Sequence, residues 1–99
     1  MNITLLKAAQ IELDEGFDYY EEQSPGLGYA FVDEMFVTLK RIKQNPTSWT
    51  PFTDRTRRCL THRFPYGVIY QFRKKENEII IVAFAHLHRK PNYWKIRLE

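Results

Sequence analysis

Seven consecutive apolar residues, from Ile79 to Ala85, constrain the fold of this chain more than any other feature. A run of this length is far too short to cross a membrane, which takes roughly 18–20 apolar residues. Because no position in the run is polar, both faces of the segment need to be covered by other parts of the chain. We therefore expect a central β-strand that is buried on both sides.

Two preceding segments alternate in polarity and predict strands that pair with this run. Residues 68–73 form one of them, and the polar loop Lys74–Asn77 joins it to the run as a hairpin. Residues 57–64 form the other. Their alternation places Leu60 and Phe64 on one face, and Cys59, Thr61 and Arg63 on the other. Together these segments predict a three-stranded antiparallel meander.

The N-terminal half has helical periodicity. Residues 8–22 predict a first helix, in which Leu13, Phe17 and Tyr20 share one face and acidic residues occupy the other. The sequence Ser24-Pro25-Gly26 then breaks the helix.

A second helix is predicted from Leu27 to Gln44, and Asn45-Pro46 ends it because the residue before proline disfavours helical geometry. Its apolar stripe consists of Phe31, Met35, Leu39 and Ile42. The tight connection between the two helices predicts an antiparallel hairpin. The stretch from Asn45 to Pro51, which contains two prolines, is expected to be a loop.

A short apolar run, Ile3 to Leu6, adds an N-terminal strand. We therefore expect an α+β fold of the order β-α-α-β-β-β, in which a two-helix hairpin packs on an antiparallel β-sheet. The 99 residues predict a single domain, 1–99. The single cysteine, Cys59, excludes an internal disulfide and a cysteine-based zinc site, and no secretory signal is evident, so a cytoplasmic protein is expected.

Charge is unevenly distributed along the chain. Residues 1–50 carry four basic and eight acidic side chains, whereas residues 51–99 carry eleven basic and four acidic ones. The basic half suits an anionic partner, either nucleic acid or an acidic protein, although it can also be simply a solvated face. Six of the twelve acidic residues lie in the first predicted helix, where we expect a solvated face. They are Glu12, Asp14, Glu15, Asp18, Glu21 and Glu22.

Several short stretches form a set that spans nearly the whole chain. They are Ala8–Leu13, Tyr19–Gln23, Gly26–Gly28, Arg63–Tyr70 and His86–Arg97. The most specific are Phe-Pro-Tyr at residues 64–66 and a His-x-x-Arg-x-Pro-x-x-Trp tail that begins at His86. With this order of elements, the sequence resembles the RelE/ParE superfamily of type II toxin–antitoxin toxins.

The resemblance implies one of two activities. One branch of the superfamily cleaves mRNA in the ribosomal A site without a metal or cofactor, and the other binds DNA gyrase and blocks it. Both are neutralised by a cognate antitoxin whose C-terminal segment wraps the toxin. A toxin–antitoxin heterocomplex is therefore expected, and a membrane partner is not.

Ribonuclease chemistry of this kind needs a base for the 2′-hydroxyl, cations for the phosphorane and an acid for the 5′-oxygen. Histidine and arginine are the suitable side chains near neutral pH. If the chain is a ribonuclease, its candidate catalytic residues are His62, His86, Arg89 and Trp94. The resemblance implies a phosphate contact for Arg89 and base stacking for Trp94 or Tyr93.

The sequence departs from the ribonuclease branch in two places. That branch commonly has Tyr-Arg where this chain has Tyr66-Gly67, so the arginine is missing. Its type member also has a lysine pair on the preceding strand, where this chain offers Arg57, Arg58, His62 and Arg63. The missing arginine and the well-formed helical hairpin favour the gyrase branch.

The candidate residues also have structural interpretations. His62 alternates with Leu60 and Phe64 and can point inward, whereas His86 can cap the end of its strand. Trp94 can pack the tail onto the sheet, and Cys59 is expected to be a small strand residue. His86 and His88 share a face if the strand continues, but no third ligand is near in sequence, so no metal site is expected.

We predict a toxin that inhibits gyrase by protein contact, with a metal-free ribonuclease as the alternative. Two further alternatives are a binding module that retains only the antitoxin site and a general nucleic-acid binder. No cofactor is expected. The residues predicted to contact the target are Arg57, Arg58, Arg63, His88 and Arg97.

Overall fold

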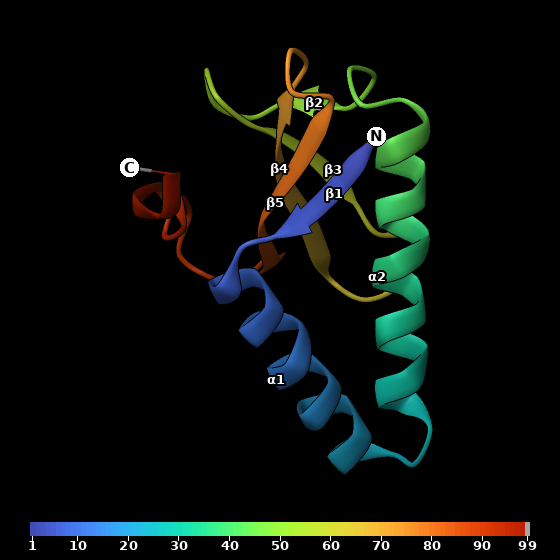
Figure 1. Ribbon diagram of the computed structural model, residues 1–99. Helices are drawn as coiled ribbons and strands as arrows, with labels where there is room; N and C mark the ends of the chain where they lie inside the picture. Colours follow the sequence, from blue (N-terminus) through green and yellow to red (C-terminus); the bar gives the residue numbers. More distant parts are fainter. Residues whose placement is uncertain (99) are drawn as a thin grey trace.

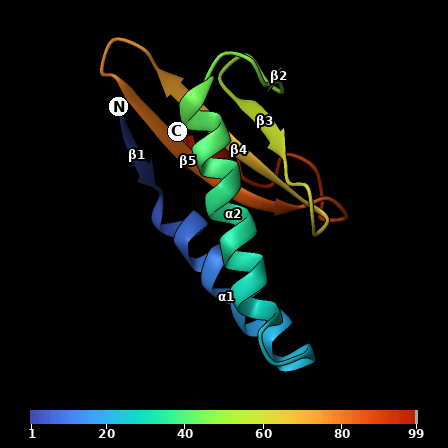
Figure 2. The same ribbon diagram turned by 90° about the vertical axis from the view of Figure 1, so that its right-hand side faces the viewer.

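The computed structural model describes residues 1–98 and shows two helices packed against one face of a five-stranded sheet (Figure 1). The elements are β1 (Asn2–Leu5), α1 (Lys7–Gln23), α2 (Leu27–Gln44), β2 (Thr50–Pro51), β3 (Arg57–Leu60), β4 (Tyr66–Arg73), β5 (Glu78–His86) and the 3-10 helix η1 (Lys95–Leu98). The helical hairpin extends beyond the sheet at its connecting turn, as two perpendicular views show (Figure 1 and Figure 2). The predicted α+β fold is confirmed.

The sheet has the strand order β1-β5-β4-β3-β2. The predicted meander is present, because β4 pairs antiparallel with both β3 and β5. Strand β1, however, runs parallel to β5, from Asn2 opposite Glu78 to Leu5 opposite Ile81, so the sheet is mixed. Strand β1 covers the edge of β5 that β4 leaves open, and the intervening helices and strands provide the long connection that a parallel pair needs.

The loop predicted between the two prolines contains a short edge strand. In β2, Thr50 lies opposite Arg58 and Pro51 lies opposite Arg57. Proline is tolerated here because β2 is the last strand of the sheet.

Both helices end within one residue of the predicted positions. Gly26 adopts a positive φ of 90° in the turn between them. The carboxylate of Glu21, at the end of α1, accepts hydrogen bonds from the backbone N–H groups of Gly26 (3.0 Å) and Gly28 (2.9 Å). A side chain of α1 therefore caps the first turn of α2. Helix α2 ends at Gln44, directly before Asn45-Pro46.

The main core lies between the hairpin and the sheet. The predicted stripe of α2, which consists of Phe31, Met35, Leu39 and Ile42, is buried there against β3, β4 and β5. Glycine allows the helices to approach closely, since a Cβ at Gly28 would lie 2.6 Å from the backbone oxygen of Phe17.

Strand β3 is shorter than predicted and its two faces are reversed. It ends at Leu60, which is 46% exposed, whereas Cys59 is buried beneath the helices. The cause is the register, which places Cys59 opposite Val68 on the face that the helices cover. His62 follows in an exposed turn, so its interpretation as an inward side chain is wrong.

Strand β5 is buried on both faces, as predicted. Ile79 and Ile81 contact the core beneath the helices, and Ile80 and Val82 lie on the opposite, outer face. Residues 87–98, which we call the tail, cover this outer face and place Trp94 against it. Figure 1 shows the tail on the far side of the sheet from α2.

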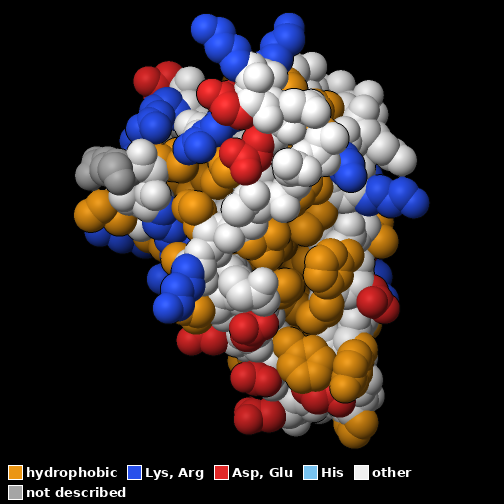
Figure 3. All heavy atoms as spheres, viewed as in Figure 1, with side chains coloured by type: hydrophobic (Ala, Val, Ile, Leu, Met, Phe, Trp, Pro, Cys, Tyr) orange, Lys and Arg blue, Asp and Glu red, His pale blue; other side chains and the backbone are white. Residues whose placement is uncertain are grey.

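The surface in Figure 3 divides by side-chain type. Apolar side chains gather between α1 and α2, acidic ones lie along α1, and lysine and arginine surround the sheet and the tail. Within residues 1–98, neither helix combines the length and the apolar character that crossing a bilayer requires.

Candidate functional site

The candidate site lies where the tail crosses the outer face of the sheet. Trp94, which is 2% exposed, packs there with Ile69, Ile80 and Val82. This small second core holds the tail on β4 and β5. It confirms the structural interpretation of Trp94, because the indole is enclosed by protein.

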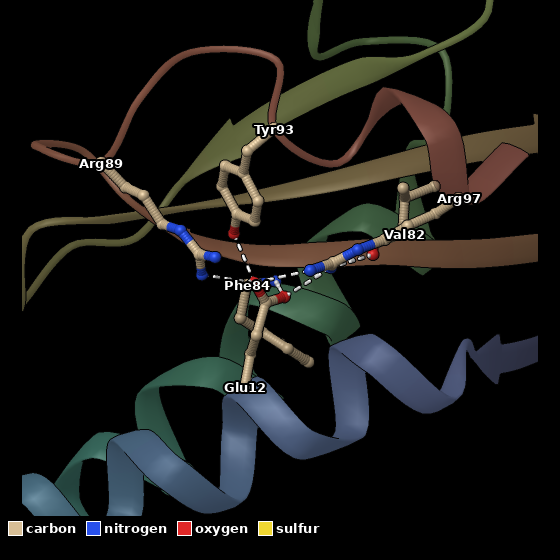
Figure 4. Close-up of polar contacts among 6 residues, drawn as sticks. All are labelled: Glu12, Val82, Phe84, Arg89, Tyr93 and Arg97. Atoms are coloured by element: carbon tan, nitrogen blue, oxygen red, sulfur yellow. Dashed lines mark hydrogen bonds and ion pairs between the residues drawn. The ribbon is translucent and has the colours of Figure 1, made fainter.

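The carboxylate of Glu12, on α1, also holds the tail in place (Figure 4). Glu12 accepts hydrogen bonds from both terminal nitrogens of Arg97 (2.8 and 3.1 Å), from Arg89 (3.3 Å) and from the hydroxyl of Tyr93. It also accepts the backbone N–H of Phe84 in β5 (3.1 Å). We call Glu12, Arg89, Tyr93 and Arg97 the Glu12 cluster.

The Glu12 cluster is a largely desolvated charge network. The side chains of Glu12 and Arg97 are 8% and 16% exposed, whereas that of Arg89 is 53% exposed. Arg97 donates a further hydrogen bond to the backbone oxygen of Val82 (2.9 Å). One negative charge faces two positive charges, so the cluster carries a net positive charge, and Arg89 presents it to solvent.

Tyr93 lies between the two guanidinium groups, which are 3.7 Å (Arg89) and 5.1 Å (Arg97) from its ring centre (Figure 4). Burial raises the pKa of the Tyr93 hydroxyl, and its hydrogen bond to the Glu12 carboxylate raises it further. Burial acts to lower the pKa of Arg97, but the hydrogen bonds and charge of Glu12 outweigh it and raise that pKa. Both groups therefore keep their protons and remain donors to Glu12.

Next to the cluster, the tail and the sheet enclose a cavity of about 100 Å³, which we call the tail cavity. Its floor consists of Gly67, Ile69 and Ala85, and one wall consists of Phe52 and Arg58. The opposite wall is formed by residues of the segment 86–94, including His86, Arg89, Lys90 and Trp94. Among residues 1–98, no aspartate or glutamate lines the tail cavity.

Because Gly67 has no side chain, a neighbouring cation has room above the floor of the tail cavity. A Cβ at this position would lie 3.0 and 3.1 Å from Cδ and Cγ of Arg58. The stem of Arg58 therefore passes directly over Gly67, and its guanidinium lies 4.5 Å from the ring centre of Phe52. The space above Gly67 is thus occupied by an arginine from the adjacent strand.

The structure brings three of the four candidate catalytic residues to the tail cavity and separates the fourth. His86, Arg89 and Trp94 line it, but His62 does not. Instead, the backbone N–H of His62 is held by the carboxylate of Glu34 on α2 (2.6 Å). The cavity therefore gathers cations and one imidazole.

His86 ends β5 and is fixed by its neighbour. Its Nδ1 accepts the backbone N–H of His88 (3.1 Å), which caps the end of the strand. The capping interpretation is confirmed. The two rings lie 5.2 Å apart, but no group of three or more His, Cys, Asp or Glu suited to a metal occurs within residues 1–98.

The residues predicted to contact the target have different surroundings. Arg58 lines the tail cavity, and Arg63 and His88 are exposed. Arg57 is half-buried and donates to the backbone oxygen of Trp49 (2.8 Å). Arg97 is engaged with Glu12, so its side chain acts inside the molecule.

Sequence reasoning missed Glu12, which the acid-rich helix led us to expect in solvent. A signal was present, because Glu12 shares the buried face of α1 with Ala9, Leu13 and Gly16. An acid on an apolar helical stripe needs a partner of opposite charge, and the tail supplies it.

A second hollow lies between the helices, with a volume of about 450 Å³, and we call it the hairpin groove. Its lining is mainly apolar, from Leu13, Phe17, Tyr29, Val32 and Phe36. Gln10, Asp14 and Asp18 of α1 complete it. Tyr29 and Phe36 are 64% and 54% exposed, which is unusual for large apolar side chains.

The chain resembles known proteins in sequence and in fold. Residues 3–91 match the family described as the ParE toxin of the type II toxin–antitoxin system, parDE. No curated protein is significantly similar in sequence. Among solved structures, the chain is similar to one described as the chromosomal ParDE TA system from P. aeruginosa. The TM-score is 0.78 at 20% identity, over 89% of this chain and 97% of that one, which shows a shared fold.

Proposed function

Because the chain belongs to the ParE toxin family of type II toxin–antitoxin systems, we propose that it arrests growth by binding DNA gyrase and blocking its activity. It is a toxin component, and its partner is a cognate antitoxin. We propose that both interactions take place in the cytoplasm. Growth arrest by contact requires no bond to be broken, so it requires a surface and not a catalytic site.

The main support for this proposal is that His62 and His86, the two candidate proton carriers, do not line the same cavity. Cleavage of RNA needs a base and an acid at one phosphodiester. His86 lines the tail cavity, whereas His62 lies outside it in the exposed turn after β3. The lining of the tail cavity holds three cations and one imidazole, that of His86, which supports inhibition by contact over cleavage.

We assign the gyrase contact to the basic outer side of the sheet and tail. Arg58, Arg89 and Lys90 line one cavity there, and Arg89 keeps about half of its side chain in solvent. Arginines that are rigidly held and partly desolvated are frequent hot spots of protein interfaces.

A supercoiling assay with purified components tests the proposal. Gyrase incubated with the chain is expected to lose supercoiling activity, and Arg89→Ala is expected to restore most of it. Lys74→Ala, which removes an exposed cation from the β4–β5 loop, is the matched control and retains inhibition. Unimpaired supercoiling at a large excess of the chain contradicts the proposal.

Ribosome-dependent cleavage of mRNA is the alternative. It is favoured by His86 and Arg89 lining the same cavity, where an imidazole and a guanidinium meet. In a translation assay with a known mRNA interferase as positive control, new cuts within codons would support it. Intact mRNA in that assay contradicts the alternative.

We further propose that the hairpin groove receives the C-terminal segment of the antitoxin. The groove has an apolar lining and two aspartates, Asp14 and Asp18, on its α1 side. This chemistry fits an amphipathic helix whose apolar face is flanked by lysine or arginine.

Substitutions at two adjacent residues on α2 distinguish binding in the groove from a general effect on the surface. Phe36 lines the groove, whereas Val37 is similarly exposed (49%) and does not line it. Phe36→Asp is expected to weaken antitoxin binding by about tenfold or more, as for a truncated hot spot, and Val37→Asp is expected to have little effect. Equal effects of the two variants contradict this position for the antitoxin.

A further inference from the structure

We propose that the tail cavity binds a backbone phosphate of duplex DNA, so that the toxin contacts both gyrase and the DNA that gyrase holds. The inference rests on the proposed function, since it names a second partner for the same surface. It adds a nucleic-acid contact to an inhibitor whose expected action is protein contact alone.

The lining of the tail cavity has an excess of positive charge, which favours binding of an anion. Among the described residues that line the cavity, Arg58, Arg89 and Lys90 are cationic and none is acidic. Within residues 1–98, no carboxylate lies within 4.0 Å of the charged nitrogens of Arg58 or Lys90. Arg89 shares the carboxylate of Glu12 with Arg97. A phosphate supplies the missing negative charge.

The geometry concentrates these cations instead of spreading them over a surface. Arg58 reaches the cavity because Gly67 has no side chain beneath its stem. On the opposite wall, Tyr93 and Glu12 hold the guanidinium of Arg89 in one position. Two arginines from distant parts of the chain thus line one small hollow, which suits a single phosphate group.

The same geometry favours a duplex over a single strand. Proteins that bind single strands offer open aromatic faces on which bases stack. Here the rings are already engaged: Trp94 is 2% exposed, Tyr93 lies between two guanidinium groups, and Phe52 packs against both Arg58 and Trp94. In a duplex the base faces are stacked on one another and the phosphates lie on the outside, so binding needs no open aromatic ring.

The test is equilibrium binding of the full chain, without antitoxin, to a short labelled DNA duplex. Salt is varied from about 50 to 200 mM, because affinity for phosphate falls steeply over this range. A single-stranded RNA of the same length forms the second arm. Tighter binding to the duplex than to the RNA is expected.

Matched variants locate the contact. Arg58→Gln and, separately, Lys90→Gln are each expected to weaken duplex binding about tenfold and to reduce the magnitude of the salt slope by about 1. Lys74→Gln removes the same charge at the far end of the β4–β5 hairpin, outside the cavity, and is expected to change binding much less. Using two cavity variants keeps the test valid if one of them fails to fold.

Three results overturn the proposal: no duplex binding at low salt, tighter binding to RNA, or equal losses in Lys74→Gln and the cavity variants. The last result indicates a diffuse basic surface without a site. Loss of gyrase inhibition is measured separately, with the supercoiling assay. A chain that inhibits gyrase but does not bind DNA therefore refutes this inference and leaves the proposed function standing.

Discussion

The hairpin groove and the tail cavity are opposite in chemistry and in how they are held together. The hairpin groove has an apolar lining with aspartates, between helices fixed to the sheet by a long apolar stripe. The tail cavity is lined by cations, on a segment fastened largely by one buried carboxylate, Glu12, and one indole, Trp94. The two regions therefore suit different partners, a cationic amphipathic helix and an anion.

The difference also predicts how each region responds to substitution. Attachment of the hairpin is spread over many apolar side chains, so a single polar substitution at its surface leaves it in place. Attachment of the tail is concentrated at Glu12, which joins α1 to β5 and to three tail residues. One substitution there is expected to loosen the whole basic surface.

Glu12→Ala is expected to have the largest effect. It leaves the guanidinium of Arg97, whose side chain is 16% exposed, without its carboxylate. Removing one partner of a buried pair lowers the free energy of unfolding by about 3–5 kcal/mol. Denaturant unfolding measures the change. Glu22→Ala, at an exposed acid of the same helix, is the control and is expected to stay within about 0.5 kcal/mol of the parent. Equal stability of the two variants contradicts the role of Glu12.

Gly28→Ala tests the hairpin side of the comparison. The added Cβ would lie 2.6 Å from the backbone oxygen of Phe17, so the helices must separate. We expect a loss of about 1–3 kcal/mol in unfolding free energy from overpacking. Since alanine is the better helix former by about 1 kcal/mol, a gain in stability would show that the close approach is unimportant.

Alkaline pH is expected to loosen both regions through buried tyrosines. Burial raises the pKa of Tyr70, in the core beneath the helices, from 10.0 to about 12. The neutral phenol is thus favoured by folding. Stability is fully present below pH 10 and is lost as pH rises toward about 12, because the unfolded chain releases its proton first. Burial also raises the pKa of Tyr93 in the tail.

Unfolding measured as a function of pH checks this sign. Tyr70→Phe is expected to flatten the decline above pH 10, and Tyr29→Phe, at an exposed ring, is the matched control. A Tyr70→Phe profile as steep as that of the parent argues against the phenol as the cause.

Arg89→Ala is expected to have the smallest effect on stability and a large one on toxicity. Its ion pair is half-exposed, and Arg97 still neutralises Glu12, so the loss should stay below about 1 kcal/mol. Growth arrest on induction is expected to fall, since the variant removes the exposed cation of the Glu12 cluster. Full toxicity in a folded Arg89→Ala variant means that this arginine does not contact the target.

Local signals predicted most of the fold. Pro25-Gly26 and Asn45-Pro46 marked the helix ends, and the run from Ile79 to Ala85 marked the strand covered on both sides. These signals depend on a few neighbouring residues, so they can be recognised without knowledge of the rest of the chain. The parallel pairing of β1 with β5 joins residues far apart in sequence and has no local signal.

The candidate site was predicted less completely, for the same reason. His86, Arg89 and Trp94 lie close together in sequence and also meet in the structure. Arg58 reaches the tail cavity from β3 because Gly67 has no side chain, and Glu12 reaches Arg89 from α1. Their surroundings are set by strand register and tail packing, which the composition of the two segments does not reveal.

The most direct test of the central claim is to induce the chain in cells and measure two things within minutes, plasmid supercoiling and the 5′ ends of mRNA. If the chain inhibits gyrase through the basic surface, plasmid supercoiling is lost and no new mRNA 5′ ends appear within codons. With Arg89→Ala, supercoiling is retained. New mRNA ends within codons, with supercoiling unchanged, would contradict inhibition of gyrase and assign His86 and Arg89 to a ribonuclease site.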